Sequence, residues 1–170
     1  MDQYVANPMS RVKIRQVVTY IRKTFNLEDE RYFPVMPFLE FGMPQIDKKF
    51  NYEIRTMQEM GSCYGITFPE ENLIAIREDV YDRAVAGTPR DRFTIAHEIA
   101  HYLLHSPKTV AYARAVGPQK VPAYLDPEWQ ANAFAGELLA PPQLIIGLEV
   151  SEVERLCGVS RTVAEIQLNL

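Results

Sequence analysis

Apolar positions recur at helical spacing in three stretches of the chain. In residues 10–25 the apolar side chains fall on one face and basic side chains on the other, which predicts an amphipathic helix. In residues 89–105 the apolar stripe is wide enough to predict a helix that starts at Pro89 and is buried on most sides. Residues 127–140 follow Asp126, a favourable N-cap, and precede two prolines, so they predict a third helix.

A second pattern, dense in β-branched and aromatic residues, lies between the first two of these helices. Three short runs of this kind cover residues 50–57, 62–68 and 72–77, with turn-forming residues between them. These runs predict a small antiparallel sheet, which gives the buried helix that follows a surface to pack against. Residues 79–86 predict a short helix that Gly87 terminates.

Prolines interrupt the apolar stretch of residues 32–44. Pro34, Pro37 and Pro44 are close enough together to argue against a helix, so the segment is expected to be extended or looped. It is also expected to bury three phenylalanines against the core, namely Phe33, Phe38 and Phe41.

The chain is long enough to bury one sizeable core. It has 170 residues, 47% of them hydrophobic, and no stretch resembles a long linker. These features predict a single domain of the α+β class over residues 1–170. Within it, residues 1–45 form the N-terminal helix and proline-rich segment, residues 46–142 the core and residues 143–170 a tail of two short helices, the second capped by Ser160.

Charge argues against a general nucleic-acid-binding surface. The formal net charge at pH 7 is −4, and the second helix of the tail has Arg161 as its single basic residue. We therefore expect a protein or peptide partner, no direct contact with nucleic acid, and a packing role for the tail.

Targeting signals and cysteines bear on the compartment. The sequence has no signal-peptide pattern and no apolar run near the roughly 18 residues that a membrane span needs. Cys63 and Cys157 are too few and too far apart for a disulfide framework, so both are expected to be free thiols packed like small hydrophobic residues. These observations predict a soluble cytoplasmic protein without membrane contact.

The helix of residues 89–105 carries an HExxH motif. His97 and His101 are four residues apart, so both imidazoles leave one helix face at a separation that a tetrahedral metal ion bridges. Glu98 is rotated by roughly 100°, which prevents ligation but lets it reach a water on the metal, as the motif requires in metallopeptidases. His105 is roughly 12 Å along the axis from His97, so it is expected behind the ligands or as a cationic helix-end residue. The competing interpretation is that the motif histidines are ordinary core residues.

A catalytic zinc site needs a third protein ligand, with the fourth position left to water. Glu128 is best placed, because it shares a helix face with Asn132 and with small residues that match small residues on the HExxH helix. Glu137 is the competitor, but it is rotated by about half a turn and is expected to face away. The alternative for Glu128 is a carboxylate that complements the helix dipole. We expect one divalent ion, Zn²⁺ ahead of Mn²⁺, at His97, His101 and Glu128.

Two segments, RDRFTIAHEIAHYLLH and EWQANAFAGELLAP, resemble the ImmA/IrrE family of intracellular metallopeptidases, whose ligand pattern is gluzincin-like. The resemblance is strong over residues 89–142. It implies a zincin-like fold, in which a small antiparallel sheet packs on a central HExxH helix beside a second ligand-bearing helix. It implies zinc ligands and a catalytic glutamate at the positions reached above, namely His97, His101, Glu128 and Glu98. Gln130 is a departure, since a second acidic residue is common there.

The resemblance also implies a function. Family members cleave or inactivate a helix-turn-helix repressor, so that stress or mobile-element genes are expressed. The sequence leaves the oxyanion-stabilising residue open among three candidates, Tyr112, Tyr124 and Arg114. The alternative function is a non-catalytic module in which zinc holds the fold together and which inactivates its partner by binding. Closed structural sites generally use four protein ligands, so three ligands beside Glu98 favour the enzyme.

Overall fold

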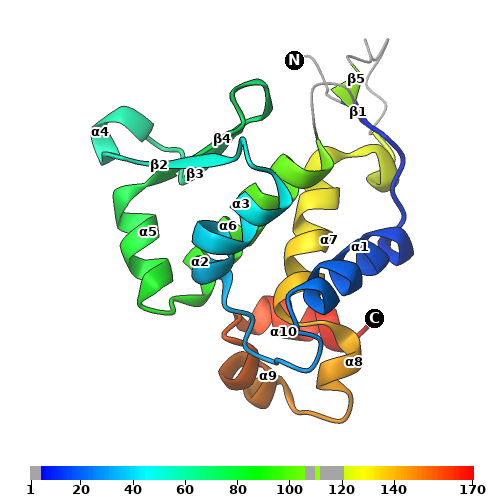
Figure 1. The fold of residues 1–170 in the computed structure, drawn as a ribbon. Helices are drawn as coiled ribbons and strands as arrows, with labels where there is room; N and C mark the ends of the chain where they lie inside the picture. The colour runs from blue at the N-terminus through cyan, green and yellow to red at the C-terminus, as the bar shows by residue number, and fades with distance from the viewer. Residues whose placement is uncertain (1–4, 106–109, 112–120) are drawn as a thin grey trace.

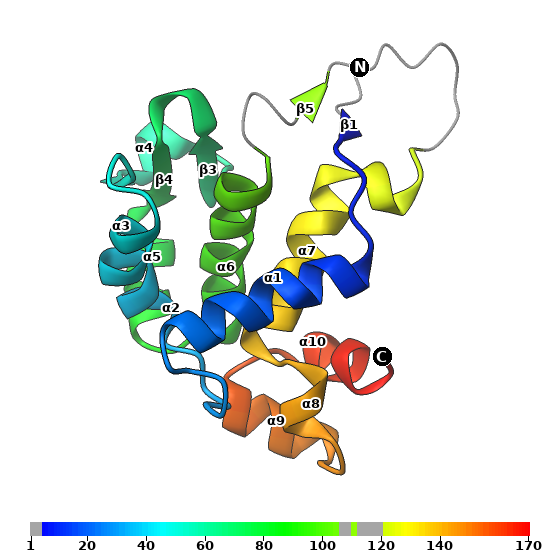
Figure 2. The ribbon, with the colours of Figure 1, turned by 45° about the vertical axis from the view of Figure 1, so that its right-hand side comes forward.

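Two helices form the centre of the molecule, whose computed structural model describes residues 5–105, 110–111 and 121–170. They are α6 (Pro89–Leu104) and α7 (Pro127–Leu139), which pack side by side (Figure 1, Figure 2). A three-stranded sheet packs on α6, and α1 (Arg11–Thr24) packs on α7. The helical fold of these three segments confirms the prediction from apolar periodicity.

Small residues allow α6 and α7 to approach closely. Four alanines of the two helices are fully buried, namely Ala96, Ala100, Ala131 and Ala135. Side chains this small let two helix backbones come near each other, which brings groups on their facing sides within reach. The two helices are in contact and these alanines are part of the buried core.

The sheet that supports α6 is mixed rather than antiparallel. Its strands are β2 (Asn51–Arg55), β3 (Gly65–Phe68) and β4 (Leu73–Arg77), and its order is β2-β4-β3. The β3–β4 pair is antiparallel as predicted, but β2 and β4 run parallel. The cause is the central place of β4, the most apolar strand and one that is buried along its whole length. The chain passes from β2 through α4 (Met57–Met60) to the far edge before it returns through the middle.

From Val35 on the proline-rich segment is helical, so the expectation of an extended or looped chain was wrong there, whereas residues 32–34 lie outside any helix. It contains α2 (Val35–Pro37), the π-helix η1 (Phe38–Gly42) and α3 (Met43–Ile46). Pro34 lies just before α2 and Pro37 lies in its first turn, where a missing N–H costs no intrahelical hydrogen bond, and Pro44 lies just after the π-helix. Phe33 and Phe38 are buried as expected, whereas Phe41 is 68% exposed.

A buried carboxylate ties α1 to α7. Glu137 is fully buried and accepts hydrogen bonds from Arg15 at 2.9 and 3.0 Å and from Arg11 at 3.4 Å. Two arginines thus compensate its charge, as a buried ion requires. Glu137 therefore points towards α1, as the half-turn rotation from Glu128 predicts.

The remaining elements are short. The helix α5 (Glu78–Val85) is followed by Gly87 in a left-handed conformation, with φ of 89°, which agrees with the predicted terminator. Other short elements are β1 (Val5–Ala6), which pairs antiparallel with β5 (Val110–Ala111), and η2 (Pro69–Glu71), η3 (Ala123–Leu125) and α8 (Pro142–Ile145).

The tail forms two helices that pack on the core, α9 (Val150–Cys157) and α10 (Arg161–Leu168). The Ser160 side chain accepts a hydrogen bond from the backbone N–H of Val163, which confirms the predicted cap. Both cysteines are free, but Cys63 is exposed and Cys157 alone is buried. Within the described part of the chain, no helix combines the length and apolar character of a membrane span.

Candidate metal centre

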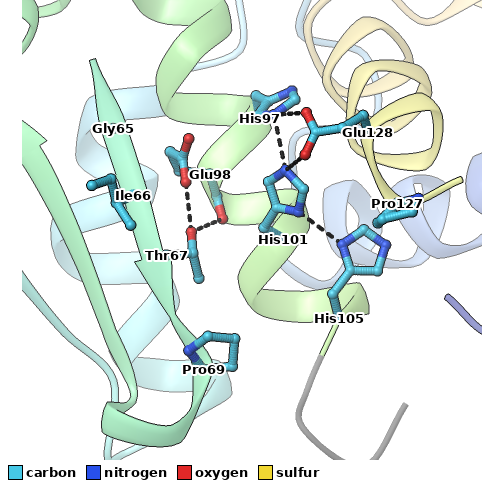
Figure 3. Close-up of a pocket in the computed structure, with 10 residues that line it drawn as sticks. All are labelled: Gly65, Ile66, Thr67, Pro69, His97, Glu98, His101, His105, Pro127 and Glu128. Atoms are coloured by element: carbon cyan, nitrogen blue, oxygen red, sulfur yellow. Dashed lines mark hydrogen bonds and ion pairs between the residues drawn. The ribbon is translucent and has the colours of Figure 1, made fainter. Parts of the chain in front are cut away.

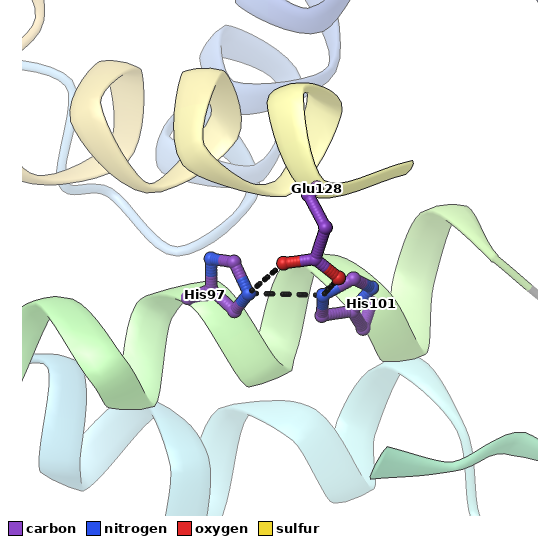
Figure 4. Close-up of side chains that lie close together, drawn as sticks. All are labelled: His97, His101 and Glu128. Carbon is purple, nitrogen blue, oxygen red and sulfur yellow. Dashed lines mark hydrogen bonds and ion pairs between the residues drawn. The ribbon is translucent and has the colours of Figure 1, made fainter. Parts of the chain in front are cut away.

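Three side chains from α6 and α7 converge on one point (Figure 4). The Nε2 atoms of His97 and His101 are 2.9 Å apart, and Glu128 reaches both of them. Its Oε2 is 3.3 Å from Nε2 of His97, and its Oε1 is 3.2 Å from Nε2 of His101. One potential ligand atom from each residue lies within 4.8 Å of the other two. The fold thus brings together the three residues that the sequence singles out.

The start of α7 places Glu128 at this point. Asp126 is the N-cap, and its side chain accepts a hydrogen bond of 2.9 Å from the backbone N–H of Glu128. Pro127 occupies the first turn, where its fixed φ suits the helix. These two residues fix where the helix begins, so Glu128 lies in the first turn and faces the histidines of α6 (Figure 4).

The cluster borders an open pocket of about 470 Å³ (Figure 3). One wall is β3, which contributes Gly65, Ile66 and Thr67, and the other walls come from α6 and from the start of α7. The side chain of Glu128 is 66% exposed and those of the two histidines are 17% exposed. The candidate ligands therefore face a space large enough for water and part of a substrate.

Charges and hydrogen bonds make the cluster attractive to a cation. Hydrogen bonds from His101 and His97 hold the pKa of Glu128 well below its usual range, so its carboxylate is ionised near neutral pH. Burial alone would lower the pKa of His97, but the hydrogen bond to Glu128 and the negative charges of Glu98 and Glu128 outweigh it and raise that pKa. Without a metal, the Glu128 carboxylate therefore favours the protonated form of His97, whose proton takes the place of the ion.

The donor set fits a zinc ion of the catalytic type. Two imidazole nitrogens and a carboxylate oxygen are the three protein ligands of one known class of catalytic zinc site. Among the described residues, no further His, Cys, Asp or Glu belongs to the group. A closed structural site would need a fourth protein ligand, so this arrangement leaves a coordination position towards the pocket.

Glu98 leaves α6 towards the sheet, whereas the two histidines face α7 (Figure 3). Its Oε2 accepts a hydrogen bond of 2.7 Å from the Thr67 hydroxyl on β3. A Cβ atom at Gly65 would lie 2.6 Å from Cγ of Glu98, so the close approach of strand and helix requires glycine there. Glu98 lines the same pocket as the histidines without joining their cluster, which matches its expected separation from the ligands.

Each histidine is held from behind by a second polar group. Nδ1 of His97 is 2.9 Å from Oδ1 of Asn132, one turn along α7 from Glu128. Nδ1 of His101 is 2.9 Å from Nδ1 of His105, whose Nε2 is 2.9 Å from Oε1 of Gln130. Asn132 could be foreseen from its spacing to Glu128. Gln130 stood out only as a departure from the family pattern, which does not indicate its contact with His105.

His105 has one of the two roles expected for it, a place behind the ligands, and not the other, a cationic residue at the helix end. It lies directly behind His101, as expected of a residue behind the ligands. Burial lowers its pKa to about 4, so it is neutral near pH 7. The interpretation as a cationic helix-end residue was therefore wrong, because the ring is 4% exposed and its charged form would lose solvation.

The candidates for oxyanion stabilisation are only partly within the described residues. Tyr112 and Arg114 lie outside them. Tyr124 is in η3, is 50% exposed and does not line the pocket.

Comparison with protein-family models gives the family of the chain. The family model described as the IrrE N-terminal-like domain (Peptidase_M78) matches residues 80–168, more than half of the chain, and covers α6, α7 and both tail helices. No curated protein matches the sequence. The chain belongs to the IrrE N-terminal-like, or ImmA/IrrE, family of metallopeptidases.

Proposed function

We propose that the protein is a zinc-dependent endopeptidase that hydrolyses peptide bonds of a protein partner. One observation carries the proposal: His97, His101 and Glu128 converge beside an open pocket that Glu98 also lines. His97, His101 and Glu128 would hold the ion, and membership of a metallopeptidase family supports the reaction class.

Glu98 is the proton carrier in this mechanism. Bound zinc would supply Lewis acidity, which polarises a carbonyl and lowers the pKa of water to about 7. Glu98 then takes a proton from the attacking water and later delivers it to the leaving amine nitrogen. The Thr67 hydroxyl orients the carboxylate through Oε2, and a carboxylate has a second oxygen that can accept the proton.

The substrate binds along β3 in this proposal. Among the described residues, β3 has a strand partner on one side only, which is β4. An edge strand offers backbone groups to an extended peptide, which can add as a further strand. Because Gly65, Ile66 and Thr67 line the pocket, a peptide paired with β3 would pass directly in front of Glu98.

The partner that we propose is a cytoplasmic helix-turn-helix transcriptional repressor of a stress or mobile-element operon. Resemblance to the ImmA/IrrE family supports this choice. Direct DNA binding is not part of the proposal, because Arg161 of α10 is paired with Glu165 at 2.9 Å and the net charge is −4. We expect no sequence-specific affinity tighter than about micromolar for promoter DNA of its operon in an anisotropy titration without repressor. Tighter sequence-specific binding would contradict this expectation.

The decisive experiment is incubation of the purified protein and Zn²⁺ with the repressor encoded beside its gene. Cleavage products identified by mass spectrometry, and absent with Glu98→Gln, would support the proposal. If Glu98→Gln inactivates the repressor as well as the wild type does, the protein is a non-catalytic binding module instead. If neither protein changes the repressor, the proposed partner is wrong.

A further inference from the structure

Two polar side chains, His105 and Gln130, continue the contacts of the candidate ligand His101 into the protein interior, and Figure 3 shows the first of these contacts, from His101 to His105. His101 meets His105 through their Nδ1 atoms, and Nε2 of His105 meets Oε1 of Gln130, each at 2.9 Å. The amide nitrogen of Gln130 donates to the carbonyl oxygens of Asn7 at 2.9 Å and Tyr124 at 2.8 Å. His105 is 4% exposed and Gln130 is fully buried.

We propose that His105 and Gln130 are positioning residues that hold a ring hydrogen of His101 on Nδ1, so that Nε2 is the nitrogen left to bind the metal. The role in metal binding rests on the proposed function. The direction of each hydrogen bond follows from the contacts described next.

The orientation of Gln130 is fixed by what surrounds it. Carbonyl oxygens accept hydrogen bonds and never donate them, so the group that faces Asn7 and Tyr124 must be the amide NH₂. The other end of the amide is then Oε1, which faces Nε2 of His105 and can only accept. His105 must therefore carry a hydrogen on Nε2.

This hydrogen sets the direction of the next contact. A neutral imidazole has one N–H, so His105 with its hydrogen on Nε2 offers a lone pair at Nδ1. Nδ1 of His101 faces that lone pair and must donate. A neutral His101 with its hydrogen on Nδ1 has its lone pair on Nε2, the atom 3.2 Å from Glu128. Metal ligation needs this tautomer.

Only an amide side chain satisfies every partner at position 130. A carboxylate would accept from His105 but would repel the two carbonyl oxygens. An apolar side chain would remove the partner of His105 Nε2, the hydrogen bond to the Asn7 carbonyl and one of the two donors to the Tyr124 carbonyl, which also accepts from the backbone N–H of Met9. The corresponding support of His97 is simpler, since exposed Asn132 accepts at Nδ1. The geometry thus makes His101 the more firmly prepared of the two histidine ligands.

Zinc affinity of the full-length protein, measured by competition with a chromophoric chelator, tests the relay. Gln130→Met and His105→Phe should each weaken zinc binding by about 10- to 100-fold, the effect typical of removing a partner behind a ligand. Gln167→Met is the matched control, because Gln167 is also buried and donates to the carbonyl of Ala140 away from the site. It should change the zinc affinity by less than about twofold. Unchanged affinity in a folded Gln130→Met protein would overturn the proposal.

The tautomers are read independently by nitrogen NMR of ¹⁵N-histidine-labelled protein. The chain has 3 histidines, so the ring signals are few enough to assign. We expect the hydrogen on Nε2 of His105 and on Nδ1 of His101, with and without Zn²⁺. A hydrogen on Nδ1 of His105 would contradict the relay even if zinc binds. If the wild type binds no zinc, the proposed function fails, and the tautomer in the metal-free protein still decides the relay.

Discussion

The helix side and the sheet side of the pocket are built differently. On the helix side, α7 is held by buried polar contacts: Glu137 to two arginines of α1, and Gln130 to His105 and two backbone carbonyls. On the sheet side, β3 is an edge strand whose residues are only partly buried. The Thr67 hydroxyl of β3 donates a hydrogen bond to the Glu98 carboxylate and so links this strand to α6.

This difference teaches where precision is needed. Metal ligands must keep their geometry, and α7 carries one of them on a helix whose surroundings allow little movement. An edge strand that receives a peptide must instead keep backbone groups open, so fewer buried contacts can hold it. The predictions below test whether the two sides have these separate duties.

The largest effect is expected from removing the histidines on α6. His97→Ala and His101→Ala should each abolish stoichiometric metal binding, because two protein ligands rarely hold a catalytic zinc ion. Elemental analysis after dialysis against metal-free buffer measures this. Asn132→Ala is the control and should retain metal with reduced affinity, since it removes only the support of His97. Stoichiometric metal in the double histidine variant would place the site elsewhere.

Glu98→Gln should separate chemistry from metal binding. We expect loss of hydrolysis by about 10² to 10⁴-fold, the usual size of a general acid–base contribution, with the metal content and fold retained. Turnover of the cognate repressor and circular dichroism measure the two outcomes. Glu70→Gln, at an exposed carboxylate of η2, should cleave normally. Full activity of Glu98→Gln would remove Glu98 from the mechanism.

Local sequence signals were sufficient for the three longest helices and for singling out His97, His101 and Glu128, which the fold brings together. Pro89, Asp126 and Pro127 mark helix starts through effects within one turn, and the spacing of His97 and His101 is a property of one helix. Such signals do not depend on distant segments, so the sequence alone predicts them.

Features that depend on distant segments were missed. The parallel β2–β4 pairing arises because the most apolar strand takes the centre of the sheet, which no strand pattern specifies by itself. Gln130 acquires its role from the Asn7 carbonyl, 123 residues away, and from His105, 25 residues away. The helical turns of residues 35–46 were missed because a count of prolines ignores that a first turn tolerates them, as it does at Pro37.

The stability of the helix side should depend on the buried carboxylate. Arg15→Met leaves Glu137 with the longer Arg11 contact, and we expect a loss of about 2 kcal/mol in the free energy of unfolding, less than for a fully buried pair because Arg15 is partly exposed. Urea denaturation measures it. Arg161→Met is the control, since its pair with Glu165 is exposed and should contribute under about 0.5 kcal/mol. Equal losses would show that burial of Glu137 is not what matters.

The smallest effect is expected on the sheet side, from Thr67→Val. Valine keeps the shape of threonine but cannot donate to Glu98, so the carboxylate loses its support from β3 while the histidines keep theirs. We expect turnover of the repressor to fall by about 10-fold, which corresponds to the loss of one hydrogen bond that positions Glu98. Zinc affinity should be unchanged. Thr67→Ser retains the hydroxyl and should restore most of the activity. If Thr67→Val weakens zinc binding as much as turnover, β3 also holds the metal ligands in place, and the two sides of the pocket do not have separate duties.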